Sequence, residues 1–98
     1  MAVEGLVREI FEVIVGRSKE LPPGSYTAYL FKEGQDKILK KIGEEAAEVI
    51  IASKGGGGSR LAAEMADLVY HLLVLLAWHG MEPGCVLEEL ARRRGKQN

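Results

Sequence analysis

Two acidic runs separated by four consecutive glycines most constrain how this chain can fold. Both runs lie in the stretch KIGEEAAEVIIASKGGGGSRLAAEMAD. In a helix that turns by about 100° per residue, Glu44, Glu45 and Glu48 fall on one face. Glu64 and Asp67 share a face of the following helix. The glycines are too flexible to belong to either helix, so we expect an antiparallel pair of helices whose acidic stripes converge.

Carboxylates that converge repel one another unless a cation lies between them. Magnesium fits this role because it prefers oxygen ligands and keeps several waters, which leaves positions open for substrate phosphates. The spacing of Glu45 and Glu48 recurs in the acidic pair of the second helix, and this repetition favours a shared Mg²⁺ site. For any single acid, a solvated helix face is the simpler interpretation.

The length and charge of the chain exclude several classes of protein. Its 98 residues suit one domain, and we expect residues 1–98 to form it. The 13 basic and 14 acidic residues nearly balance, which gives no indication of nucleic-acid binding or of a membrane surface. The single cysteine, Cys85, excludes an intramolecular disulfide and a zinc site built from several cysteines.

The distribution of apolar residues predicts a soluble, cytoplasmic protein. Charged residues interrupt the N-terminal stretch MAVEGLVREIFEVIVGR, so it lacks the uncharged core of a signal peptide. The longest apolar run, Leu72 to Trp78, is too short to span a bilayer. Because this run is apolar on every side of a helix, it must be surrounded, and we expect self-association to do so.

Helical periodicity predicts an all-α fold, since the chain shows no strand-like alternation of polar and apolar residues. Proline and glycine clusters mark the connections between helices. The apolar spacing predicts helices over residues 2–16, 35–54 and 59–80, a shorter helix in SYTAYLFKEG, and a last one around Val86.

Small polar residues predict where some of these helices begin. Ser25 or Thr27 is expected to cap the short helix, and Ser59 the helix that follows the glycines. Gly43 lies inside a predicted helix, where glycine costs about 1 kcal/mol relative to alanine. We expect either a close approach by another backbone or a ligand at Gly43, or simple tolerance of the glycine.

Four segments of the chain resemble one enzyme family. They are SYTAYL, KIGEEAAEV, EMADLVYHLLVLL and the closing ELARR, and together they span nearly the whole chain. The resemblance is to phosphoribosyl-ATP pyrophosphohydrolase, one of the MazG-like all-α nucleoside triphosphate pyrophosphohydrolases. Glu-Glu-x-x-Glu followed by Glu-x-x-Asp marks the wider group, and SYTAYL and YHLLVLL narrow the likeness to the histidine-pathway member.

This resemblance implies a fold, a reaction and a set of ligands. The fold is a MazG-like antiparallel helical bundle, completed by homo-oligomerisation as a homodimer or a larger assembly. The reaction is hydrolysis of a small-molecule nucleotide, phosphoribosyl-ATP, to phosphoribosyl-AMP and pyrophosphate, with magnesium required. It is the second step of histidine biosynthesis. The metal ligands of the family fall on Glu45, Glu48, Glu64 and Asp67, and Glu44 lies beside the site.

The acids also offer candidates for catalysis. A triphosphate carries several negative charges, so attack at phosphorus requires that charge to be neutralised and the leaving pyrophosphate to be stabilised. A carboxylate that metal does not fully engage can orient or deprotonate the attacking water. Glu44 and Glu45 are placed for this role, with Glu45 the stronger candidate as a ligand and Glu44 a candidate base.

Four basic residues near the acids have two interpretations each. Lys37, Lys41 and Arg60 extend the acidic stripes by helical turns. They can pair with the acids as helical neighbours or hold phosphate oxygens of the substrate. His71 can likewise bind a phosphate or be hydrogen-bonded within the core.

Three other functions fit parts of the same pattern. A house-cleaning pyrophosphohydrolase would keep the fold and act on another nucleoside triphosphate. A non-catalytic helical dimerisation module would carry the acids as surface charge only. A carboxylate-bridged di-iron bundle normally needs Glu-x-x-His pairs, whereas Tyr70 stands at that spacing from Asp67 and His71 comes one residue later.

Overall fold

The computed structural model of the protein describes residues 3–97, and the secondary structure within them is entirely helical. The predicted all-α fold is therefore confirmed. The helices, in chain order, are α1 (Val3–Glu20), α2 (Tyr26–Glu33), α3 (Gln35–Lys54), α4 (Gly58–Trp78) and α5 (Pro83–Gln97).

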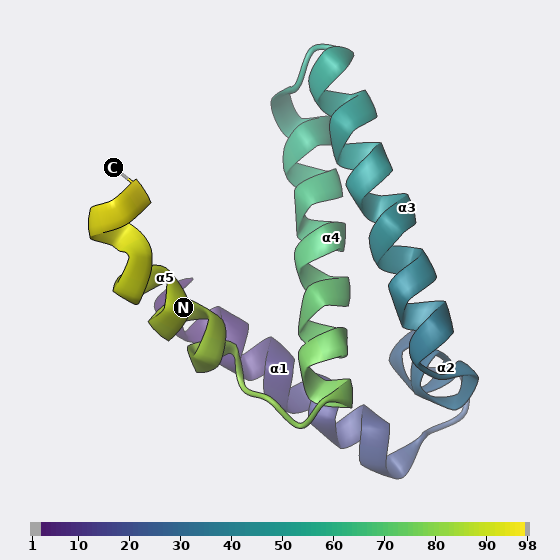
Figure 1. Cartoon of the computed structure of the whole chain (residues 1–98). Coiled ribbons are helices and arrows are strands. Elements are labelled where there is room, and N and C mark those ends of the chain that lie inside the picture. Colours follow the sequence, from purple (N-terminus) through teal and green to yellow (C-terminus); the bar gives the residue numbers. More distant parts are fainter. Residues whose placement is uncertain (1–2, 98) are drawn as a thin grey trace.

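The acid-bearing helices α3 and α4 form an antiparallel hairpin (Figure 1). They lie side by side and are joined at one end by the glycine loop. At the other end, α1 crosses beneath the hairpin and packs on α4, while α2 lies against α1 and α3. α5 contacts α1 and projects away from the hairpin (Figure 1). The predicted pairing of the two acidic helices is thus confirmed.

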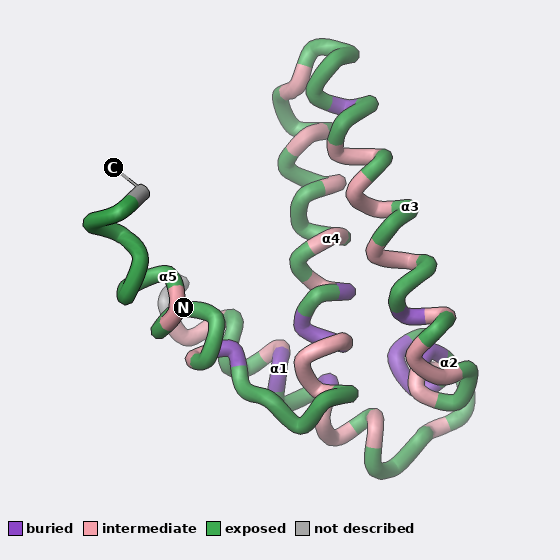
Figure 2. The backbone as a smooth tube through the Cα atoms, viewed as in Figure 1, coloured by how far each residue is buried: buried purple, intermediate pink, exposed green. Residues whose placement is uncertain are grey.

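The core lies at the end of the hairpin where α1 and α2 meet α3 and α4 (Figure 2). Each of these helices contributes one large, fully buried side chain, and together these form the centre of the core. These side chains are Ile14, Leu30, Ile38 and Val74. Because all four helices meet there, the core fixes how the hairpin sits on α1 and α2.

The short helix α2 is capped as the sequence predicts. The hydroxyl of Ser25 accepts a hydrogen bond from the backbone N–H of Ala28 at 3.1 Å. This bond satisfies one of the donors that a helix leaves free at its start. Thr27, the other candidate, is already part of α2 and its side chain is buried. Its hydroxyl is hydrogen-bonded to the hydroxyl of Tyr70 on α4.

The prediction that Ser59 caps α4 is wrong. The helix begins at Gly58, with Gly57 in the capping position and no side-chain hydrogen bond. Gly57 has a φ of 74°, which glycine adopts readily, so the chain enters the helix before it reaches the serine. At Gly43, a Cβ would meet no atom from outside its own helical turn within 4 Å, so no other backbone segment within residues 3–97 approaches it.

The first helix is longer than predicted. It continues past Gly16 to Glu20, because one glycine lowers the stability of a helix without ending it. Leu21, the first residue after the helix, has a φ of 48° and lies just before Pro22. A positive φ is strained for leucine, and the proline prevents any continuation of the helix.

The apolar second half of α4 is only partly enclosed within one chain. Leu73 and Val74 are buried, whereas Leu72 and Trp78 are 41% and 40% exposed. The ring of Trp78 stacks on that of Phe31, with centroids 6.1 Å apart. The expectation that this segment must be surrounded is therefore met on one side of the helix only.

By length and composition, α4 is the one described helix that could cross a membrane. Its mean hydropathy reaches 1.5 over 18 residues. The same helix carries Glu64 and Asp67, whose charges would be costly inside a bilayer. Its apolar side chains also supply part of the core against α1 and α3. This single helix does not indicate a membrane protein.

We expect Ile38→Ala to lower the free energy of unfolding by about 3 kcal/mol, because it leaves a cavity at a fully buried position. Leu39→Ala is the matched control, since Leu39 is the next residue on α3 and is 45% exposed. This control should lower the free energy by less than about 1 kcal/mol. Urea denaturation measures both values, and equal losses would contradict this placement of the core.

Candidate metal centre

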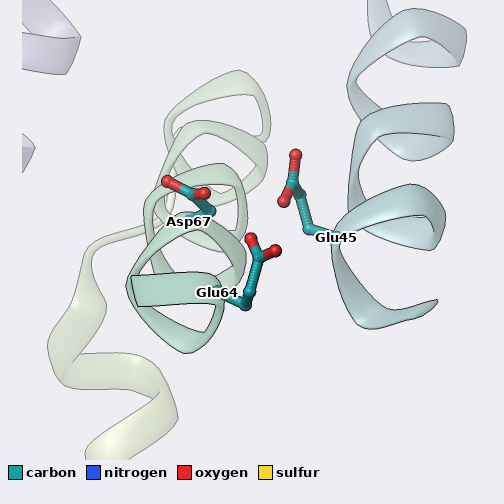
Figure 3. A group of neighbouring side chains, drawn as sticks. All are labelled: Glu45, Glu64 and Asp67. Carbon is teal, nitrogen blue, oxygen red and sulfur yellow. The ribbon is translucent and has the colours of Figure 1, made fainter. Parts of the chain in front are cut away.

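Three carboxylates from α3 and α4 face one another across the hairpin. Glu45 projects from α3 toward Glu64 and Asp67, which lie one helical turn apart on α4 (Figure 3). One ligand oxygen from each lies within 4.8 Å of the other two. Glu45 and Glu64 are half-buried and Asp67 is exposed, so the group is open to solvent on one side.

The close approach of the carboxylates changes the pKa of one of them, Glu64. Partial burial and the nearby Glu48, Asp67 and Glu45 carboxylates raise the pKa of Glu64, while Arg60 opposes the rise. The charged form of Glu64 is thus disfavoured in the protein alone. A bound cation would reverse this effect, because it favours the charged form of every carboxylate around it.

The residues present fit a divalent cation with a preference for oxygen. They offer carboxylate oxygens from two helices, and histidine or cysteine ligands are absent from the group. Magnesium binds through a few carboxylates and retains several waters, which an open, three-carboxylate site permits. Zinc sites in proteins more often use histidine or cysteine ligands.

Glu48, the fourth predicted ligand, lies outside this group of three. Its carboxylate pairs with the guanidinium of Arg60 on α4 at 3.7 Å. Both side chains are substantially exposed, and such ion pairs stabilise proteins by less than about 1 kcal/mol. Glu48 still lies close enough to Glu64 to raise its pKa. It therefore borders the group and forms a weak ion pair outside it.

Glu44, the candidate base, is exposed on α3 beside Glu45. The ammonium of Lys41 lies 3.3 Å from the carboxylate of Glu44 and 3.8 Å from that of Glu45. The hydrogen bond to Glu44 is the main cause of the raised pKa of Lys41. Lys41 thus pairs with the acids in the manner of a helical neighbour, and it brings positive charge to the edge of the carboxylate group.

Lys37 lies one turn before Lys41 on α3. Its ammonium is 5.7 Å from the centre of the Tyr29 ring on α2, a cation–π contact. A hydrogen bond to the Tyr29 hydroxyl raises the pKa of Lys37. The structure therefore places Lys37 against an aromatic side chain, whereas Lys41 is paired with carboxylates.

His71 is buried and both of its ring nitrogens are engaged. Nδ1 lies 2.7 Å from the backbone carbonyl oxygen of Asp67, one turn earlier on α4. Because a carbonyl can only accept, Nδ1 carries the hydrogen, and Nε2 accepts a hydrogen bond from the Tyr26 hydroxyl at 2.7 Å. To bind a phosphate, His71 would have to give up one of these bonds.

Tyr26 is the residue of this site that sequence reasoning missed. Through His71, its hydroxyl connects α2 to the turn of α4 that carries Asp67. Partial burial raises its pKa, with smaller effects from Lys41 and Glu45. No spacing rule links Tyr26 to His71, because 45 residues separate them. Only its membership of the SYTAYL segment marked it out.

Comparison with known proteins supports one assignment. Residues 7–94 match the PRA-PH family, described as phosphoribosyl-ATP pyrophosphohydrolase. The chain is 64% identical over 98 residues to the phosphoribosyl-ATP pyrophosphatase of Pelotomaculum thermopropionicum, covering 100% of both chains. The protein of the same name from Geobacter sulfurreducens is 51% identical over 92 residues, covering 94% of this chain and 85% of that protein. The histidine biosynthesis bifunctional protein HisIE of Bacillus subtilis is also 51% identical over 92 residues, covering 94% of this chain and 44% of that protein.

We expect Glu64→Gln to raise the Tm of the metal-free protein at pH 7, because it removes one of the crowded charges. The pKa of Glu64 is raised in the folded state, so its ionised form destabilises the fold at neutral pH. This destabilisation is relieved as the pH falls through the folded pKa toward 4.5, the usual value. The Tm difference between variant and wild type, measured by calorimetry, should therefore shrink over the same range.

The control is Glu12→Gln, which removes an exposed carboxylate from α1. It should leave the Tm nearly unchanged at every pH. A Tm for Glu64→Gln below that of the wild type at pH 7, in the presence of a chelator, would show that the carboxylates do not repel one another in this way.

Proposed function

The chain belongs to the phosphoribosyl-ATP pyrophosphohydrolase family, and from this premise we propose that magnesium held between α3 and α4 supports its reaction. The protein is an enzyme of histidine biosynthesis that hydrolyses phosphoribosyl-ATP to phosphoribosyl-AMP and pyrophosphate. The observation that carries the proposed site is the meeting of three carboxylates from two helices within 4.8 Å.

We assign the magnesium ligands to Glu45, Glu64 and Asp67, with Glu48 as a fourth. The first three already lie together, and Glu48, one turn after Glu45 on α3, is held only by an exposed ion pair with Arg60. When bound, magnesium supplies a Lewis acid and a template for phosphate oxygens. The open side of the group, next to Asp67, is where the triphosphate would approach.

Glu44 is the residue we assign to the attacking water. It neighbours a proposed ligand but does not belong to the group of three, so its carboxylate would accept a proton without giving up a bond to the metal. Its present partner, Lys41, is a partly exposed ammonium at 3.3 Å that holds the carboxylate at the edge of the site. Glu45 would contribute chiefly as a ligand.

The cations around the acids would receive the phosphates. Lys41 and Arg60 each border the carboxylate group through an ion pair, and Lys37 continues the line along α3. Exposed pairs of this kind are weak, so a substrate phosphate can replace the carboxylate partner. His71 would act indirectly, since its bonds to Asp67 and Tyr26 position the turn that carries the ligand.

We also propose that the chain, a single domain over residues 1–98, works as a homodimer or larger oligomer in the cytoplasm. Its accessible surface is 6795 Å², whereas a compact monomer of 10.7 kDa exposes about 5,500 Å². Its radius of gyration is 14.8 Å, against about 13 Å for a compact domain of this length. The excess surface exceeds the roughly 800 Å² that each partner buries in a standard interface.

Apolar side chains on the hairpin are available to form that interface. Several of them are exposed on the surfaces of α3 and α4, and an exposed apolar surface of this kind favours association with another chain. They are Leu39, Ile50, Ile51, Met65, Val69 and Leu72.

We expect Glu45→Gln and Asp67→Asn to lower kcat/KM for phosphoribosyl-ATP by about 10²- to 10³-fold, because each removes a proposed ligand. Both variants should also lose the rise in Tm that magnesium gives the wild type. Glu44→Gln should lower kcat by about 10²-fold or more yet keep the magnesium-dependent rise in Tm. A coupled pyrophosphate assay and thermal unfolding with and without magnesium provide the two measurements.

Glu88→Gln, an exposed change on α5, is the control and should behave as the wild type. The same assay with a panel of nucleoside triphosphates tests the substrate. Preferential turnover of the panel over phosphoribosyl-ATP would favour a house-cleaning enzyme of the same fold. Absence of turnover by the wild type, with phosphoribosyl-ATP and with every member of the panel, would favour a helical module without a catalytic site.

We expect the protein to have a mass in solution of at least twice 10.7 kDa, because the hairpin leaves apolar surface uncovered. Size-exclusion chromatography with light scattering measures this mass. Ile50→Glu, at a 64% exposed position, should shift the distribution toward smaller species if the hairpin forms the interface. A mass of one chain for the wild type, with full activity, would rule the oligomer out as a requirement.

A further inference from the structure

A hollow with basic margins lies beside α2, outside the carboxylate group. It consists of two adjoining clefts that share Pro22, Gly24 and Ser25. One cleft, of about 380 Å³, extends along α2 to Lys32. The other, of about 400 Å³, extends to Arg17 at the end of α1. Each cleft is of the size that binds small molecules, so the hollow has room for a sugar phosphate.

Arg17 and Lys32 are both available to an anion. Each is exposed, and neither forms an ion pair with another residue in the described part of the chain. Lys41 and Arg60, the cations beside the carboxylates, are by contrast already paired with acids. The margins of the hollow therefore carry positive charge that nothing within this part of the chain neutralises.

The hollow communicates with the candidate metal centre through two tyrosines. Tyr26 and Tyr29 line it, with ring centroids 6.3 Å apart. The hydroxyl of Tyr26 is hydrogen-bonded to His71 on α4, and the charge of Glu45 contributes to the raised pKa of Tyr26. Tyr29 contacts Lys37, two turns before Glu45 on α3. An elongated ligand could thus run from the carboxylates, over the aromatic rings, into the hollow.

The substrate has the shape and charge that this arrangement requires. Phosphoribosyl-ATP carries a triphosphate on one ribose and a separate phosphate monoester on a second ribose, joined through the adenine. ATP has the first group and the adenine but lacks the second. A site that contacts only the triphosphate cannot distinguish phosphoribosyl-ATP from ATP. Specificity requires a contact that only one of these nucleotides makes.

We propose that Arg17 and Lys32 bind the phosphate of the phosphoribosyl group and so select phosphoribosyl-ATP over ATP. This inference rests on the proposed function of the carboxylate site. The adenine would lie over Tyr26 and Tyr29, whose flat rings suit a base. The doubly charged monoester would then enter the hollow, where the guanidinium of Arg17 and the ammonium of Lys32 would bind it, one from each cleft.

The first test is kinetic. We expect Arg17→Ala and Lys32→Ala each to raise KM for phosphoribosyl-ATP by roughly tenfold, because each removes a hydrogen bond between charged groups. Inhibition by ATP should be unchanged, since ATP does not reach the hollow. The kcat at saturation should stay within about twofold, because the contact is equally strong in ground state and transition state. Lys32→Arg should restore the wild-type KM.

Lys54→Ala is the matched control, because Lys54 is exposed at the far end of α3 (Figure 1). Its KM should equal that of the wild type. Two results would overturn the proposal: a KM for phosphoribosyl-ATP that neither alanine variant changes, or an equal weakening of ATP inhibition. The second would mean that the two cations attract any nucleotide by general electrostatics.

The second test does not depend on catalysis. Titration with ribose 5-phosphate should shift the backbone amide resonances of Gly24 and Ser25 in the wild type and in Glu45→Gln, but not in the double variant Arg17→Ala/Lys32→Ala. Failure of the wild type to hydrolyse phosphoribosyl-ATP would defeat the proposed function and leave this measurement valid. Shifts that are absent, or that persist in the double variant, would defeat the hollow as a phosphate site while leaving the enzymatic assignment intact.

Discussion

Three carboxylates lie close enough in the hairpin to repel one another, and this repulsion determines what the site can bind. The hairpin holds oxygens of Glu45, Glu64 and Asp67 within 4.8 Å of one another, a distance at which like charges oppose each other strongly in a partly buried site. The raised pKa of Glu64 is the direct consequence. Lys41 offsets part of this charge from 3.8 Å, but a single ammonium on α3 contacts only that side of the group. A divalent cation between the helices would balance the remaining negative charge. The crowding that destabilises the metal-free protein would then favour binding of the cation.

The core makes this crowding possible by fixing the register of the two helices. Glu45 lies seven residues after the buried Ile38, and Asp67 lies seven residues before the buried Val74, so each acid is about 10 Å from the core along its own helix. Because α3 and α4 are antiparallel, the two acids arrive at the same height. If one helix slipped along the other by one turn, the two acids would move about 5 Å apart, and the three carboxylates would no longer lie together. Packing in the core therefore determines whether the carboxylates of α3 and α4 lie together.

The sequence predicted those features that depend on local periodicity. The bounds of α3 and the pairing of its acidic face with that of α4 follow from residue spacing and the glycine linker, and both were correct. Contacts between distant segments could not be predicted in this way. The bond from Tyr26 to His71 depends on how α2 is placed against α4, which no repeat in the sequence specifies. The start of α4 was missed because the conformation of Gly57, rather than a side chain, decides it.

In the proposed arrangement, the Tyr26–His71 bond helps to fix the distance between the two ends of the substrate site. The carboxylates belong to α3 and α4, whereas Arg17 and Lys32 belong to α1 and α2, so the distance between the two sets depends on how these pairs of helices are joined. The core joins them at one level, and Tyr26 joins them again beside Asp67 through His71. A substrate charged at both ends can satisfy both sets at once. On this proposal, a nucleotide without the second phosphate leaves Arg17 and Lys32 without a partner. The enzyme would then select its substrate by the distance between the two charged groups, and not by the affinity of either site alone.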